Sequence, residues 1–249
     1  MLVHPDEALI RVVLPGFKES FRRMLAAQRS GEDLLPICRN HRRTGKEYQP
    51  SFWYFTGFPD NARDNTSFTP RKRVDLAACQ YRNAQGLAAL CRAADDPDTG
   101  EFMETAYTLR RQTPDKMWDG EDGFFYDLHH QTEEKTRINN VTGADPLWAC
   151  LTDGEAYLLA LDTALSEAFA TGTALPSQAA AGPYSCPRVA GRAACSRGET
   201  AACGTARPGP SPRSWFWAPP PAAQAARAPL RRILREAFAA IQPGALQGA

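Results

Sequence analysis

The sequence predicts a mainly α-helical fold in which helical hairpins, joined by irregular loops, are stacked around an axis. Apolar side chains recur at helical spacing over two long segments, 74–94 and 99–116. The glycine patterns that bind dinucleotides or nucleotide phosphates do not occur in the chain, so no motif favours a βαβ fold. From about residue 171 the composition changes to Ala, Pro, Arg, Ser and Gly, and we expect the helical architecture only before that point.

Two helices are expected near the N-terminus. Asp6 is well placed to cap a short helix that ends near Leu14, and Pro15 suits the first turn of the next helix. Gly31 is a typical residue to end that second helix. Four apolar residues fall at helical spacing within it: Phe17, Phe21, Met24 and Leu25.

The segment 74–94 has the clearest helical pattern of the chain. Its apolar stripe contains seven residues: Val74, Ala77, Tyr81, Ala84, Leu87, Ala88 and Cys91. The acidic turn 95–98 breaks this helix and can cap the next one, expected at 99–116. Three residues of that next helix are expected to face inward: Phe102, Ala106 and Leu109.

Short strands are expected after these helices. Residues 118–123 have the composition of a turn, and residues 124–128 alternate enough for a strand. The segment 136–141 is expected to pair with that strand, which gives a short β-hairpin near 124–141. A further helix is expected at 153–168.

The last third of the chain has a different character. Residues 168–249 contain nine Arg, no Lys and only two acidic residues, Glu199 and Glu236. Chains of this composition normally remain unfolded, because they bury too little apolar surface. We therefore expect a domain at 1–177 followed by a low-complexity, irregular tail at 178–249.

Length, charge and hydropathy exclude several classes of function. The 249 residues are enough for one large domain or two small ones. A net charge of +1 gives no electrostatic case for binding nucleic acid or an anionic membrane. No stretch approaches the roughly 18 uninterrupted apolar residues of a spanning helix, and the N-terminus lacks the layout of a signal peptide. The sequence predicts a cytoplasmic protein that binds neither nucleic acid nor a membrane.

Cysteine and histidine usage gives no support for a metal site or a disulfide framework. The seven cysteines are odd in number and contain no Cys-x-x-Cys pair. The four histidines are not at ligand spacing with cysteines or with one another. We expect neither a metal nor a cofactor.

Residues 38–73 show neither helical nor strand periodicity and are rich in aromatic residues. A loop this long in a compact domain is usually functional or disordered, and the aromatic density favours an ordered, functional one. Trp53, Tyr54 and Phe58 stand just before the run Asp-Asn-Ala-Arg-Asp-Asn at 60–65. Rings cover the apolar faces of a pyranose, amides hold its hydroxyls, and a carboxyl can protonate a glycosidic oxygen. The pattern favours a saccharide site, with a surface turn as the alternative.

Several fragments, taken together, resemble enzymes related to glycoside hydrolase family 63, a group that includes mannosylglycerate hydrolase-like and trehalase-related enzymes. They occur in the order of that family over residues 14–177: Leu14–Lys18, Gly31–Pro36, Thr56–Asn61, Val74–Leu76, Trp118–Asp127, Pro146–Ala149 and Leu175–Ser177. The resemblance implies part of an (α/α)6 toroid, the six-hairpin glycosidase fold. It also implies a saccharide or glycoside as substrate and inverting hydrolysis of α-linked glucosyl or mannosyl groups.

The resemblance places the catalytic acid in the run 60–65. Asp60 would be the general acid. Asp64 is the second candidate, because the family pattern aligns only with a shift of one residue. Asn61, Arg63 and Asn65 would bind substrate hydroxyls.

Four further residues are candidate substrate ligands. Trp53, Tyr54 and Phe58 would pack against sugar rings. Asp75 would act at the same site, or would be an ordinary stabilising charge in the first turn of its helix.

The general base has no candidate in this chain. The family places a glutamate in the C-terminal half of its barrel, whereas Glu199 and Glu236 lack the surrounding motif. A barrel of twelve helices also needs more chain than this. We interpret the sequence as that of a truncated gene model or a pseudogene whose tail, from about Gln178, is frame-shifted. Two functions stay open: a fragment of an inverting glycosidase, or a non-catalytic protein derived from one that binds carbohydrate or another partner.

Overall fold

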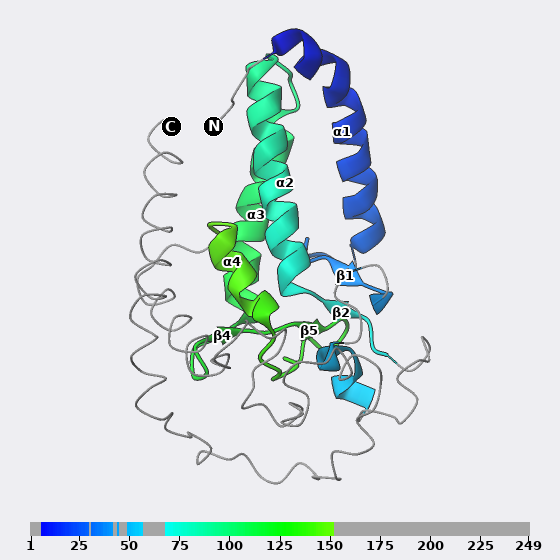
Figure 1. Cartoon of the computed structure of the whole chain (residues 1–249), viewed down its shortest axis with the longest axis vertical. Helices are drawn as coiled ribbons and strands as arrows, with labels where there is room; N and C mark the ends of the chain where they lie inside the picture. The colour runs from blue at the N-terminus through cyan, green and yellow to red at the C-terminus, as the bar shows by residue number, and fades with distance from the viewer. Residues whose placement is uncertain (1–5, 30, 42–43, 45–48, 57–67, 152–249) are drawn as a thin grey trace, which may run out of the picture.

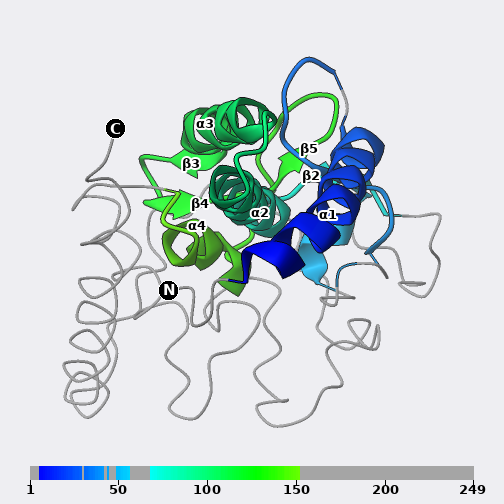
Figure 2. The same cartoon turned by 90° about the horizontal axis from the view of Figure 1, so that it is seen from above.

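The computed structural model describes residues 6–29, 31–41, 44, 49–56 and 68–151, and it is mainly helical there (Figure 1). The long helices are α1 (Glu7–Gln28), α2 (Val74–Ala93) and α3 (Thr99–Met117). Helix α2 lies between the other two (Figure 2). The shorter helical elements are the 3-10 helices η2 (Pro50–Thr56) and η3 (Val141–Ala144) and the single turn α4 (Asp145–Trp148). None of the described helices is long and apolar enough to cross a bilayer.

The short strands of the described residues gather at one end of the long helices (Figure 1). The first sheet is antiparallel and has the order β1–β2–β5, with β1 at Ile37–Cys38, β2 at Arg71–Lys72 and β5 at Leu128–His129. The second pairs β3 (Trp118–Asp119) with β4 (Phe124–Phe125). The described strands therefore join segments that lie far apart in the sequence.

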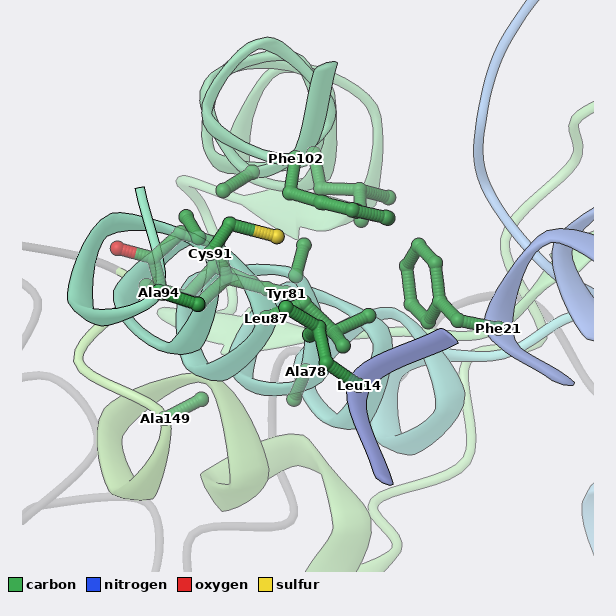
Figure 3. Close-up of a cluster of buried hydrophobic side chains, with 14 of the residues drawn as sticks. Leu14, Phe21, Ala78, Tyr81, Leu87, Cys91, Ala94, Phe102 and Ala149 are labelled. Carbon is green, nitrogen blue, oxygen red and sulfur yellow. The ribbon is translucent and has the colours of Figure 1, made fainter. Parts of the chain in front are cut away.

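The N-terminal region forms one helix, so the expected break at Pro15 is wrong. Asp6 caps α1 as expected, accepting a hydrogen bond from the Leu9 amide at 3.0 Å. The helix then continues through Pro15 to Gln28. Leu14 and Phe21, on either side of the proline, are both buried against α2 (Figure 3). This packing outweighs the single backbone hydrogen bond that proline removes.

Helices α2 and α3 confirm the periodicity of the sequence. Every residue of the predicted α2 stripe is buried, and so are the three residues of α3 that were expected to face inward. One detail differs at the start of α3. Asp98 is at the cap position, but its carboxylate accepts hydrogen bonds from Lys18 and Arg22 of α1 and from no amide of its own helix. These ion pairs link α1 to α3.

The expected strand at 124–128 is only partly right. It is divided into β4 and β5, which pair with β3 and β2. The expected hairpin is short: Leu128 forms a bridge with Lys135, and the Thr136 amide donates to the Asp127 carbonyl oxygen at 3.0 Å. The Asp127 carboxylate accepts a hydrogen bond from the Val74 amide at 3.0 Å. This contact links the residue before β5 to the start of α2.

The expected helix at 153–168 and the tail at 178–249, with Glu199 and Glu236, lie outside the described residues.

Candidate active site

The aromatic run of the predicted saccharide site lies on η2. Phe52 and Trp53 are buried and pack with Cys38 of β1, and Phe68 and Leu76 cover the same cluster. Trp53 is only 3% exposed, and its ring meets that of His41 edge-on at 5.2 Å. Tyr54 is half-buried and lies edge-on to Phe55 at 5.0 Å. Tyr54 is thus more accessible than Trp53, and the prediction that both bind a saccharide stays a prediction.

Residues 57–67, which we call the acidic segment, lie outside the described residues. They include six predicted site residues: Phe58, Asp60, Asn61, Arg63, Asp64 and Asn65. The structure describes the chain on both sides. The amide of Thr69 donates to the carbonyl oxygen of Phe52 at 3.2 Å, and the rings of Phe52 and Phe68 meet edge-on at 6.0 Å. Phe52 therefore contacts the chain that leads out of the acidic segment and lies on the element that leads into it.

Strand β2 presents a pair of arginines to Phe52. Because alternate residues of an extended strand share one face, Arg71 and Arg73 lie on the same side, and Lys72 points to the other. Both arginines are 0% exposed. Their Cζ atoms lie 3.8 Å and 5.0 Å from the centre of the Phe52 ring. Lys72 instead forms ion pairs with Asp33 and Glu133.

Arg73 is held by its neighbours through two of its three guanidinium nitrogens, and Nη1 has no hydrogen-bond partner among the described residues. Its Nε and Nη2 atoms each donate to the carboxylate of Asp75 at 2.8 Å, and Nη2 also donates to Gln49 at 3.1 Å. Burial alone would lower the pKa of Arg73, but the carboxylates of Asp127 and Asp75 outweigh it and raise that pKa. Arg73 therefore carries a firmly held positive charge.

Arg71 has a different environment. None of its three guanidinium nitrogens has a hydrogen-bond partner among the residues that the structure describes. The nearest acid is Asp127, whose Oδ2 atom lies 3.9 Å from Nε. Burial lowers the pKa of Arg71 to about 9. The guanidinium of Arg71 thus lies over the face of the Phe52 ring without a hydrogen bond to a described residue.

Asp75 is a buried member of this group. It is 4% exposed, and besides Arg73 its carboxylate accepts a hydrogen bond from the Leu76 amide at 2.8 Å. These contacts support the structural role that was the alternative for Asp75, and substrate binding by Asp75 stays a prediction.

Sequence reasoning missed most of this cluster: Gln49, Arg71, Arg73 and Asp127. Two signals were present. Arg-Lys-Arg immediately precedes the predicted helix at residue 74, and Asp127 ends one of the family-like fragments. The ring that joins them could not be assigned, because Phe52 stands far from both signals in the sequence.

No group of three or more metal-ligating side chains occurs among the described residues.

Comparison with known proteins identifies the family. The family model of the mannosylglycerate hydrolase MGH1-like glycoside hydrolase domain matches residues 3–188. Among solved structures, the GH63 mannosylglycerate hydrolase from Thermus thermophilus in complex with glucose has a TM-score of 0.62 and 17% sequence identity, over 72% of this chain and 50% of that one. Its complex with Tris and D-glycerate has a TM-score of 0.61 and 16% identity, over 72% and 55%.

No curated protein sequence matches this chain significantly. The chain spans about half the length of the solved structures that it matches. At this low identity the likeness shows the fold, which is part of an (α/α)6 toroid. The match of the family model over most of the sequence shows the family. This chain belongs to the mannosylglycerate hydrolase MGH1-like glycoside hydrolases.

Proposed function

We propose that this chain carries the general-acid side of an inverting glycosidase site, with Asp60 as the acid and Asp64 as the second candidate. The supporting observation is that Phe52, on the helix η2 that precedes the acidic segment, is held between buried neighbours. Its carbonyl oxygen accepts from the Thr69 amide, and its ring contacts two arginines and Phe68. Such a rigid support can hold a catalytic carboxyl at the fixed distance that proton transfer requires.

The proposed reaction needs two carboxyl groups. In an inverting hydrolase one carboxylic acid protonates the leaving oxygen, and a carboxylate about 6.5–9.5 Å away activates water on the opposite face of the sugar. Asp60 supplies the first group in this proposal. The base is not identified, so turnover requires a carboxylate from residues outside those described or from another chain.

The proposed substrate is an α-linked glucosyl or mannosyl compound. The similar structures contain glucose in one case and D-glycerate in another. Together with the mannosylglycerate hydrolases of the family, they make glycosides of glycerate the first compounds to test. We further propose that residues 1–177 form the catalytic domain and 178–249 a separate tail. The family match ends nearby, at residue 188.

Hydrolysis assays test this function directly. The full chain is incubated with mannosylglycerate, glucosylglycerate and α-linked disaccharides, and release of the free sugar is measured. Turnover by the wild type that Asp60→Asn abolishes would support the proposal. Turnover that Asp64→Asn abolishes, with Asp60→Asn still active, would exchange the two roles. Saturable sugar binding without turnover would overturn the catalytic proposal and favour a carbohydrate-binding protein.

A further inference from the structure

Arg71 of β2 and Arg73, the residue that follows this strand, share one aromatic ring, but only Arg73 is engaged by side-chain hydrogen bonds. Arg73 donates to Asp75 and Gln49, whereas no described residue accepts a hydrogen bond from Arg71. A buried guanidinium loses its hydration, and a single ion pair at 3.9 Å is too long to replace it with a hydrogen bond. Global stability alone therefore gives little reason for an arginine at position 71.

The ring that Arg71 covers has a special place in the chain. The Phe52 amide donates to the Gln49 carbonyl oxygen at 3.0 Å, and the Phe52 carbonyl oxygen accepts from the Thr69 amide at 3.2 Å. Its ring is tilted by 56° against the ring of His41 at 5.5 Å and lies edge-on to the ring of Phe68 at 6.0 Å. The backbone bond to Thr69 joins the two flanks of the acidic segment. Phe52 therefore contacts both flanks, through its backbone at Thr69 and through its ring at Phe68.

The Arg71 contact is suited to fixing the orientation of the Phe52 ring. At 3.8 Å from the ring centre, its planar guanidinium covers the face of Phe52, while the aromatic neighbours meet the ring at steep angles. A desolvated cation over a ring face attracts it more strongly than an exposed one does. A planar group also restrains ring tilt better than the ammonium of a lysine.

We propose that Arg71 is a positioning residue: by covering Phe52 it holds the two flanks of the acidic segment, and through them the proposed catalytic acid. This role rests on the proposed function for its catalytic consequence. Its structural consequence, the order of residues 52–56 and 68–69, can be measured whether or not the chain turns over a sugar.

Hydrogen–deuterium exchange on the full chain provides the test. In Arg71→Met, the amides of residues 52–56 and of Thr69 should exchange about tenfold faster, and the amides of α2 and α3 should keep their rates. The matched control is Arg111→Met, at an exposed arginine of α3, which should change neither set. Faster exchange spread equally over α2 and α3 would mean a general structural role and would overturn the proposal. Unchanged exchange at Thr69 would overturn it as well.

Two further measurements separate positioning from simple packing. Millimolar guanidinium ion added to Arg71→Ala should restore protection of Thr69, and it should not do so in Phe52→Leu. The double variant Arg71→Met/Phe52→Leu should be no more labile at Thr69 than Phe52→Leu alone, because Arg71 acts through that ring. Additive effects, or no rescue, would contradict the proposal.

Turnover, where the wild type shows it, adds a kinetic readout. Arg71→Met should lower kcat, since it displaces the proposed acid, and KM should rise with it, because the predicted sugar-binding residues lie on the same flanks and segment. A rise in KM with constant kcat would assign Arg71 to substrate binding instead. A wild-type chain without turnover would defeat the proposed function, while the exchange result at Thr69 would still decide the role of Arg71.

Discussion

The apolar core between the long helices and the arginine cluster around Phe52 meet along α2, and they are built on different principles. The core is a continuous set of apolar side chains from α1, α2, α3 and the residues after α4, in which Phe21 and Phe102 meet edge-on at 5.8 Å. At the N-terminal end of α2, the cluster instead buries Arg71 and Arg73 against the ring of Phe52, with the buried carboxylates of Asp75 and Asp127 beside them. The first arrangement stabilises the fold without directional bonds. The second depends on which partner each charge has.

Removal of a central ring from the core should have the largest effect. Phe102 is fully buried, so Phe102→Ala should reduce the free energy of unfolding by about 3–5 kcal/mol, through lost burial and the cavity left behind. The control is Tyr107→Ala on the same helix, where the ring is 63% exposed and the loss should be far smaller. Denaturant titration measures both. Equal losses would mean that α3 packs by a different face from the one described.

Sequence reasoning succeeded for the core and failed for the cluster for one physical reason. The buried stripe of α2 repeats every three or four residues, so one apolar residue predicts the burial of others three or four positions away. Arg71 and Asp127 face each other only because β2 pairs with β5, and neither residue has a local signal for this. The helix through Pro15 was missed for the same reason, since packing against α2 decides it.

Removing one charge tests whether the stability of the arginine cluster depends on charge pairing, as that of the apolar core does not. Asp75→Asn leaves the buried guanidinium of Arg73 without its carboxylate and should cost about 3 kcal/mol or more of unfolding free energy. Removing both charges, in Arg73→Met/Asp75→Asn, should restore part of that loss, because no uncompensated charge stays buried. A double variant less stable than either single variant would show that shape, and not charge pairing, governs the cluster.

The third test concerns Gly143, whose backbone lies close to Phe124 in the family-like fragment Trp118–Asp127. A Cβ atom at Gly143 would lie 2.4 Å from the ring of Phe124 and 3.0 Å from the Phe125 carbonyl oxygen. Gly143→Ala must therefore displace a fully buried ring, and we expect a loss of about 1–3 kcal/mol. Gly86→Ala is the matched control, because a Cβ atom in the interior of α2 meets nothing within 4 Å. That control should stabilise the chain slightly by improving helix propensity. A neutral Gly143→Ala would contradict the described packing of η3 on β4.

The smallest effect is expected on the opposite face of β2, where Lys72 and Lys116 share the carboxylates of Asp33 and Glu133. Burial alone would raise the pKa of Asp33, but the hydrogen bonds from Lys116 and Lys72 outweigh it and lower that pKa. The same two lysines lower the pKa of Glu133. Both carboxyls therefore stabilise the fold fully above their ordinary pKa values of 3.8 and 4.5, and this contribution is lost as the pH falls through their lower folded values.

Glu133→Gln measures that contribution and completes the comparison of the two faces of β2. At pH 7 the variant should lose on the order of 1 kcal/mol, a modest value because Glu133 is 38% exposed. The difference in unfolding free energy between the variant and the wild type should become smaller toward the lowest pH at which the wild type stays folded. Protonation of Glu133 removes the same charge there. Glu121→Gln, at an exposed residue, should show no such dependence. A difference that stays constant with pH would mean that Glu133 stabilises this face by packing, and that charge pairing on β2 matters only on the side of Phe52.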